Sequence, residues 1–309
     1  MWSSPVYEKR EVFLQSFHTL ISLFYICVLF VSSMISDHPL FIGGIFLLTL
    51  LTLAEAGALE KGEKLLQFGI GLTLLIMIIN PLVIRTGATI LWMSPQLPLL
   101  GRMEISLEAI CYGAAMGMRL MTLLLICCLY NEMVDPDRLL GQMTRFTYKS
   151  GLMLAMAVRL FPAVVRDLAS AREVQELRGV NFNSGHLFIR VRKYAWVFRA
   201  VLVSTLEGSF QTAEAMQARA FGSGARSCYS RDLWRPRDLI CLLTSSLALI
   251  LLIYAKIRGY CDFNYYPRLG SLWGNVTTAI WLGFILLCLA GPAFLSRGWK
   301  HSSFLRSRM

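Results

Sequence analysis

The stretch LLQFGIGLTLLIMIINPLVI, residues 65–84, carries no charged side chain from its first residue to its last. A helix of about 20 apolar residues crosses the hydrocarbon core of a bilayer, so this stretch predicts a transmembrane span. With 56% hydrophobic and only 16% charged residues in a chain of 309, more apolar surface is present than a soluble fold could bury. Five further apolar runs of similar length predict about six spans in total: residues 17–36, 39–58, 106–130, 237–256 and 273–294.

The basic residues predict the orientation of these spans. Six spans place both termini on the same side of the membrane, and 24 of the 30 lysines and arginines then fall on that side. Cytoplasmic segments carry the excess of lysine and arginine, so we expect both termini in the cytoplasm. The net charge of +11 would then face anionic lipid or an acidic partner. No aromatic-basic motif indicates binding to nucleic acid.

Residue types that perform chemistry are scattered along the chain. The eight cysteines and four histidines form no Cys-x-x-Cys or His-x-x-x-His pair, so neither a disulfide framework nor a protein-held metal site is predicted. The loop GSGAR at residues 222–226 lacks the lysine and hydroxyl residue that hold phosphate and magnesium. We therefore expect no catalytic residue, metal or cofactor in this chain, and assign any ATP chemistry to a partner.

Residues 131–236 lie outside the six runs but are not a soluble domain of ordinary composition. Apolar residues recur at helical spacing from Phe161 to Leu177 and again from Trp196 to Ala220, which predicts two long amphipathic helices. VNFNSG at residues 180–185 separates them with turn-forming residues. We expect these helices to lie at the cytoplasmic membrane surface.

Both amphipathic runs end in an arginine between small or apolar residues. The first ends Leu177-Arg178-Gly179 and the second Ala218-Arg219-Ala220. Arginine followed by glycine at a helix end is also a common C-cap, because the cation complements the carbonyl end of the helix dipole. Two such endings on parallel amphipathic runs favour a second interpretation, in which the guanidinium forks dock on two copies of a partner. Glu176, Phe221 and Gly222 are the expected supporting residues.

The segments RLFPAVVRDLASAREVQELRGVNF, residues 159–182, and STLEGSFQTAEAMQARAFG, residues 204–222, resemble the transmembrane T component of energy-coupling factor transporters, the CbiQ-type family. The two arginine endings match the family's paired motifs. The resemblance extends to Asn80-Pro81, Arg119 and Asp135-Pro136, and covers roughly residues 60–295. The chain departs from the family at QSFHTLIS, residues 15–22, and at Leu177, where a small residue is common.

The resemblance implies a mechanism and a set of partners. Two cytoplasmic ABC-type ATPases, which bind ATP and Mg, would grip Arg178 and Arg219. A separate integral membrane subunit would capture a vitamin or a transition-metal ion of the cobalt or nickel type. This chain would couple the two in the cell membrane of a prokaryote and would not itself be an enzyme.

Inside the fourth span, Gly113 and Gly117 form a small-residue face of the kind that lets helices approach closely, which predicts a packing face or a site where another membrane subunit slides. Arg119 stands mid-span, where an unpaired charge is costly, so it should face the bundle or a polar cavity. Packing within the bundle and a buried ion path are both open interpretations of Arg119.

The predicted fold class is an all-α polytopic membrane protein of about six transmembrane helices with long amphipathic cytoplasmic coupling helices. Residues 1–130 would hold the first four spans, residues 131–236 the cytoplasmic or interfacial coupling-helix domain, and residues 237–309 the last two spans and a basic tail. Two other functions stay open. A permease subunit of another ABC transporter usually has one coupling helix, and a membrane-embedded enzyme would need a convergent nucleophile and base.

Overall fold

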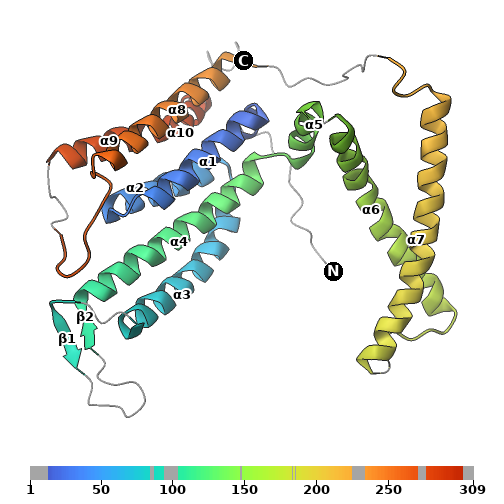
Figure 1. Cartoon of the computed structure of the whole chain (residues 1–309), viewed down its shortest axis with the longest axis horizontal. Coiled ribbons are helices and arrows are strands. Elements are labelled where there is room, and N and C mark those ends of the chain that lie inside the picture. The colour runs from blue at the N-terminus through green and yellow to red at the C-terminus, as the bar shows by residue number, and fades with distance from the viewer. Residues whose placement is uncertain are drawn as a thin grey trace. The chain divides into compact units, whose positions relative to one another are not determined.

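A computed structural model describes residues 13–83, 87–93, 104–146, 148–182, 184, 186–224, 234–270 and 276–301, most of them in helices (Figure 1). The chain divides into two compact units. Unit 1 comprises Met1–Pro136 and Asp232–Met309, and unit 2 comprises Asp137–Arg231. Unit 2 is thus inserted between two parts of unit 1. The three functional regions expected from the sequence stay a prediction, because contacts within the chain do not say on which side of a membrane a region lies.

Unit 1 is a bundle in which α1 contacts both α4 and α8, α2 packs on α4, and α3 packs along α4. Figure 1 draws α1 between the orange α8 and the green α4. A short antiparallel pair of strands, which the sequence analysis did not predict, connects α3 to α4. The elements of this unit are η1 Phe13–Ser16, α1 Thr19–Ile35, α2 Pro39–Glu55, α3 Leu59–Val83, β1 Ile90–Met93, β2 Glu104–Ser106, α4 Leu107–Met133, α8 Pro236–Ile257, α9 Val276–Leu289 and α10 Gly291–His301.

The predicted class, an all-α polytopic membrane protein, is confirmed, but the six apolar runs differ in form. Within the described residues, α3, α4 and α8 are each long and apolar enough to cross a bilayer. The helices α1 and α2 have 17 residues each, and are shorter than the runs predicted there. Large apolar side chains such as Phe68 and Ile78 on α3 are more than half exposed, as expected for a helix that faces lipid.

The last expected span, residues 273–294, is not one helix. Residues 273–275 lie outside the described part, and the remainder is divided into α9 and α10, which meet at an angle of 50°. The break lies at Ala290, and Pro292 is the second residue of α10. A proline has no backbone N–H, so Pro292 cannot donate the hydrogen bond to the carbonyl of Cys288 that would continue α9, whereas a proline is tolerated in the first turn of a new helix such as α10.

The helices of unit 2 are α5 Pro136–Phe146, whose first residue still belongs to unit 1, α6 Tyr148–Leu177 and α7 Leu187–Ala218. The two long helices predicted in this region are confirmed, and α6 continues through Pro162 as one helix. The turn between them lies where VNFNSG predicted it, and Phe182 is buried there against Tyr194, with ring centroids 5.1 Å apart. After the turn, α7 runs back and crosses α6 (Figure 1).

The apolar stripes of the two helices are mostly uncovered within the chain. Val197 and Val201 of α7 are buried, at 4% exposure each. In contrast, Leu177 is 85% exposed and Phe210 is 70% exposed. A stripe at helical spacing therefore predicted the helices correctly, but most of its side chains do not contribute to a core in unit 2.

Candidate coupling site

The end of α6 is a C-cap of defined geometry. Arg178 is the first residue after the last helical residue, Leu177. Gly179 has φ +87°, in the left-handed region that glycine adopts without steric cost. Its N–H donates to the carbonyl of Glu176 at 3.0 Å, and the N–H of Val180 donates to the carbonyl of Gln175 at 3.0 Å. This pair of bonds is the Schellman motif, which satisfies the last carbonyl groups of a helix.

The end of α7 repeats the same motif. Arg219 is the C-cap residue, and Ala220 takes the left-handed position with φ +51°. The N–H of Ala220 donates to Gln217 at 2.9 Å and that of Phe221 donates to Met216 at 3.0 Å. Alanine in this conformation brings its Cβ close to the backbone carbonyl, at a cost of about 1–2 kcal/mol. The two arginines therefore occupy equivalent positions on equivalent caps, although only one cap has the glycine that the motif favours.

The guanidinium groups of Arg178 and Arg219 are exposed. Among the described residues neither group takes part in a hydrogen bond or an ion pair. Arg172, in contrast, pairs with Glu176 at 2.9 Å on the surface of α6 and lies over the ring of Phe182 at 5.8 Å. The expected supporting carboxylate of Glu176 is thus occupied within its own helix, and the two cap arginines stay available to a partner.

The two arginine motifs lie far apart in unit 2. Because α7 begins next to the end of α6 and has 32 residues, its length of about 48 Å, at roughly 1.5 Å per residue, separates the two motifs. Phe221 is half exposed beside Arg219, and Gly222 continues the turn with φ +95°. One chain therefore presents two similar cationic ends, each with an apolar neighbour, at opposite ends of α7.

A cavity of about 670 Å³ lies between α6 and α7, and its lining extends to Met216 in the last turn of α7. Arg159 and Arg166 of α6 line it together with Ser209 and Thr212 of α7. The sequence analysis did not single out these residues. The spacing of the two arginines could have predicted that they act together, because residues seven positions apart on a helix lie on the same face.

Gly113 and Gly117 of α4 face α3 within the same chain. A Cβ on Gly117 would lie 2.4 Å from Cγ2 and 3.0 Å from Cα of Thr73, and one on Gly113 would lie 3.2 Å from Cα of Met77. The absence of side chains at both positions permits this close approach of α3 and α4. The close helix approach expected on this face is made by α3 of the same chain, and the sliding of another membrane subunit there stays a prediction.

Arg119 faces a polar contact inside the bundle. Its Nη2 atom lies 2.8 Å from Oδ1 of Asp37 and also donates to the carbonyl of Ser36, in the turn between α1 and α2. The Arg119 side chain is 13% exposed. Lys256 of α8 approaches the second oxygen of Asp37 at 3.5 Å, and the Tyr265 hydroxyl donates to the Asp37 carbonyl at 3.0 Å. Of the two interpretations of Arg119, the contacts fit packing within the bundle.

Comparison with known proteins shows the family of this chain. Residues 12–228, which run from the first turn before α1 past the end of α7, match the CbiQ family, described as cobalt transport protein. The chain belongs to the CbiQ family. The matched region starts upstream of the resemblance expected from the sequence and ends before α8, so it contains both arginine motifs but not the last two apolar runs.

Several curated relatives of this CbiQ-family chain are named energy-coupling factor transporter transmembrane protein EcfT. The protein of Streptococcus thermophilus is 30% identical over 124 residues, which is 39% of this chain and 47% of the relative. That of Thermotoga maritima is 26% identical over 35% of this chain and 41% of the relative. These alignments span less than half of each relative. The Bacillus subtilis protein is 22% identical over 77% of this chain and 90% of its own length.

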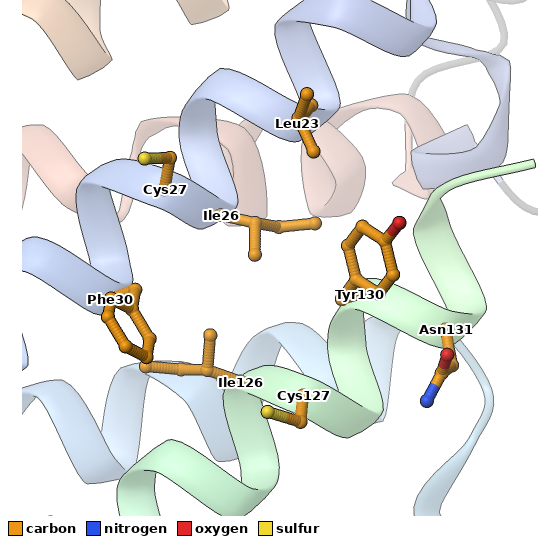
Figure 2. Close-up of a pocket in the computed structure, with 8 residues that line it drawn as sticks. All are labelled: Leu23, Ile26, Cys27, Phe30, Ile126, Cys127, Tyr130 and Asn131. Carbon is orange, nitrogen blue, oxygen red and sulfur yellow. The ribbon is translucent and has the colours of Figure 1, made fainter. Parts of the chain in front are cut away.

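The CbiQ family is described as cobalt transport protein, so side chains that could bind a metal ion are of interest. No group of three or more His, Cys, Asp or Glu side chains that could hold a metal ion occurs in the part of the chain that the structure describes. A cavity of about 270 Å³ lies between α1 and α4. Figure 2 shows Cys27 on its α1 wall and Cys127 on its α4 wall. The remaining lining is Leu23, Ile26, Phe30, Ile126, Tyr130 and Asn131. This apolar lining resembles a surface for hydrocarbon rather than a site for a hydrated cation.

Proposed function

We propose that this chain is the transmembrane energy-coupling subunit of an ECF-type ABC importer. Two partner ATPases bind ATP and Mg and hydrolyse ATP, and each holds one arginine motif. A separate integral membrane subunit captures the transported vitamin or transition-metal ion. The chain converts closure of the ATPases into movement of that subunit.

The observation that carries the proposal is the duplicated cap. Two helices that cross in one unit end in the same hydrogen-bonded motif, and each displays an exposed arginine without a partner in the described chain. An arginine presents five N–H donors in a planar fork, which suits charge-assisted bonds to carboxylates or carbonyls of a partner. The separation of about 48 Å, from 32 residues at roughly 1.5 Å each, leaves room for two globular subunits.

The uncovered apolar side chains of unit 2 support the same function. Phe161 is 68% exposed, Trp196 is 63% exposed and Phe210 is 70% exposed. Large apolar surfaces of this kind are covered in a functional assembly by lipid or by other subunits. With both termini in the cytoplasm, unit 2 lies on the side where the ATPases and the cytoplasmic face of the capture subunit are found.

Replacing both cap arginines tests this function. Removal of one partner of a buried charge-assisted contact costs about 2–5 kcal/mol of binding free energy. Arg178→Ala and Arg219→Ala should therefore each weaken co-purification of the ATPases and uptake of solute, and the double variant should abolish both. Melting temperature should change little, because an exposed cation at a helix end contributes about 1 kcal/mol or less.

Arg172→Ala is the matched control. Arg172 is also an exposed arginine near the end of α6, but it is already paired with Glu176. Arg226, a second control suggested by the sequence, lies outside the described residues. Normal ATPase association and uptake in the Arg178/Arg219 double variant would leave the arginines as simple helix caps and refute the coupling function of these motifs.

A further inference from the structure

The residues immediately before α1 connect two helices that are far apart in the sequence. Unit 2 leaves unit 1 after α4, which ends at Met133, and the chain returns to unit 1 before α8, which begins at Pro236. α1 packs against both of these helices. The segment Gln15–His18, called here the N-terminal segment, makes polar contacts with the end of α4 and with the start of α8.

On the α4 side, the amide Nε2 of Gln15 donates to the backbone carbonyl of Glu132 at 3.0 Å. The Glu132 side chain is buried, at 4% exposure, and its carboxylate pairs with Lys61 of α3. Glu132 directly follows Tyr130 and Asn131 in the chain, two residues that line the cavity in Figure 2. The N-terminal segment is thereby joined to the last turn of α4, directly before the chain passes into unit 2.

On the α8 side, the contacts are more extensive. The guanidinium of Arg237 donates to the carbonyl of Ser16 at 2.7 Å and lies over the ring of Phe17 at 5.9 Å. The carboxylate of Asp238 accepts from the backbone N–H of His18 at 3.3 Å and from that of Arg235 at 3.0 Å. One aspartate thus caps the first turn of α8 and also fixes the start of α1.

These charges are buried. Arg237 is 3% exposed, Asp238 is 1% exposed and Phe17 is 3% exposed. Buried charged groups need well-formed partners, and loss of one partner is strongly unfavourable. The N-terminal segment is therefore held firmly on α8 by buried contacts, and on α4 by the hydrogen bond from the half-buried Gln15.

We propose that the N-terminal segment is a clamp that holds the end of α4 and the start of α8 at a fixed spacing. Gln15 and Arg237 are positioning residues of this clamp. A load applied through unit 2 reaches both helices together, because the two points at which the chain enters and leaves unit 2 cannot separate. This second part rests on the proposed function, since ATP-driven movement of the coupling helices supplies the load.

The clamp is tested first by distance measurement, which does not depend on transport. Spin labels on Asn131→Cys and Leu239→Cys, both exposed, report the spacing of the two helix ends by pulsed electron paramagnetic resonance. The exposed Cys27 and Cys127, the half-buried Cys111, and Cys228, which lies outside the described residues, are first replaced by serine. The full chain should give a narrow distance distribution in lipid nanodiscs.

The double variant Gln15→Ala with Arg237→Gln should broaden this distribution and add longer distances. Gln15→Ala alone removes a half-buried side chain and its hydrogen bond to the Glu132 carbonyl, and should shift the ratio of clamped to released molecules by roughly fivefold. This single variant keeps the test valid if the double variant does not fold. Arg297→Gln is the matched control, because Arg297 pairs with Glu55 at 3.0 Å and joins α10 to α2 instead. An equally narrow distribution in the clamp variants and the control would overturn the clamp.

Transport measurements then test the transfer of load. The clamp variants keep both arginine motifs, so they should still bind the ATPases, and these should still hydrolyse ATP. Solute uptake per ATP hydrolysed should fall roughly fivefold or more, which corresponds to a typical coupling free energy between two sites. Arg237→Lys, which keeps a cationic donor, should restore part of the uptake. Separated labels with normal uptake would overturn the transfer of load. Absence of ATPases from the unmodified chain would refute the proposed function instead, and the label distances would still decide whether the clamp exists.

Discussion

Gly179 and Ala220 occupy the same left-handed position on the two caps. Replacing Gly179 by alanine should destabilise the end of α6, whereas replacing Ala220 by glycine should stabilise the end of α7. Alanine in this conformation costs about 1–2 kcal/mol. Glycine loses about 0.5–1 kcal/mol more conformational entropy on folding than alanine does. The difference leaves roughly 0.5–1 kcal/mol in favour of glycine at either position, which corresponds to a two- to fivefold change in the opening equilibrium of the last helical turn.

Amide hydrogen exchange measured by mass spectrometry resolves this change at each cap. At the end of α7 the N–H groups of Arg219, Ala220 and Phe221 are hydrogen bonded, at 3.2, 2.9 and 3.0 Å. Exchange in a peptide covering residues 215–222 should slow two- to fivefold in Ala220→Gly, by the free-energy difference given above. In Gly179→Ala, exchange in residues 174–181 should accelerate by a similar factor.

Gly208→Ala provides the control for this measurement. Gly208 lies inside α7, and a Cβ added there would meet no atom within 4 Å. Alanine should stabilise the middle of the helix by about 0.5–1 kcal/mol and leave exchange at both caps unchanged. If Gly179→Ala did not accelerate exchange, or if Ala220→Gly accelerated it, the two helices would not share the cap geometry described here.

Two further substitutions test unit 1. Gly117→Ala places a methyl carbon 2.4 Å from Cγ2 of Thr73. It should lower the free energy of unfolding by about 1–3 kcal/mol and lower the melting temperature. Gly71→Ala is the control and should lower neither, because a Cβ at Gly71 would meet no atom within 4 Å. An unchanged melting temperature in Gly117→Ala would contradict the close contact of α3 and α4. With cytoplasmic termini, Asn264→Cys should react with an impermeant maleimide in intact cells. Labelling only after lysis would show that the chain has the opposite orientation in the membrane. Native Cys261 should stay unlabelled, because it is fully buried and burial raises the pKa of its thiol to about 11.

Local properties of the sequence predicted much of this protein. Apolar runs long enough to cross a bilayer indicated the membrane class, and spacing at the helical period indicated α6 and α7 together with the turn between them. The two arginines at the helix ends were recognised because cap residues act within one turn of their helix. In each case the physical cause lies within a short stretch of chain, so the sequence alone was sufficient.

Properties that depend on distant partners could not be predicted in this way. Asp37 pairs with Arg119 across 82 positions of the sequence, and nothing near either residue indicates the other. The glycines of α4 predicted a close helix contact, but not that α3 would be the partner.

The left-handed conformation of Ala220 was likewise not evident, because alanine is ordinarily a helix-forming residue. The contacts of the N-terminal segment with α4 and α8 were not predicted either. Composition and periodicity determine which segments become helices and which of their faces are apolar. The choice of partner for each face, and of counter-charge for each buried ion, follows from packing the whole bundle, and only the tertiary structure decides it.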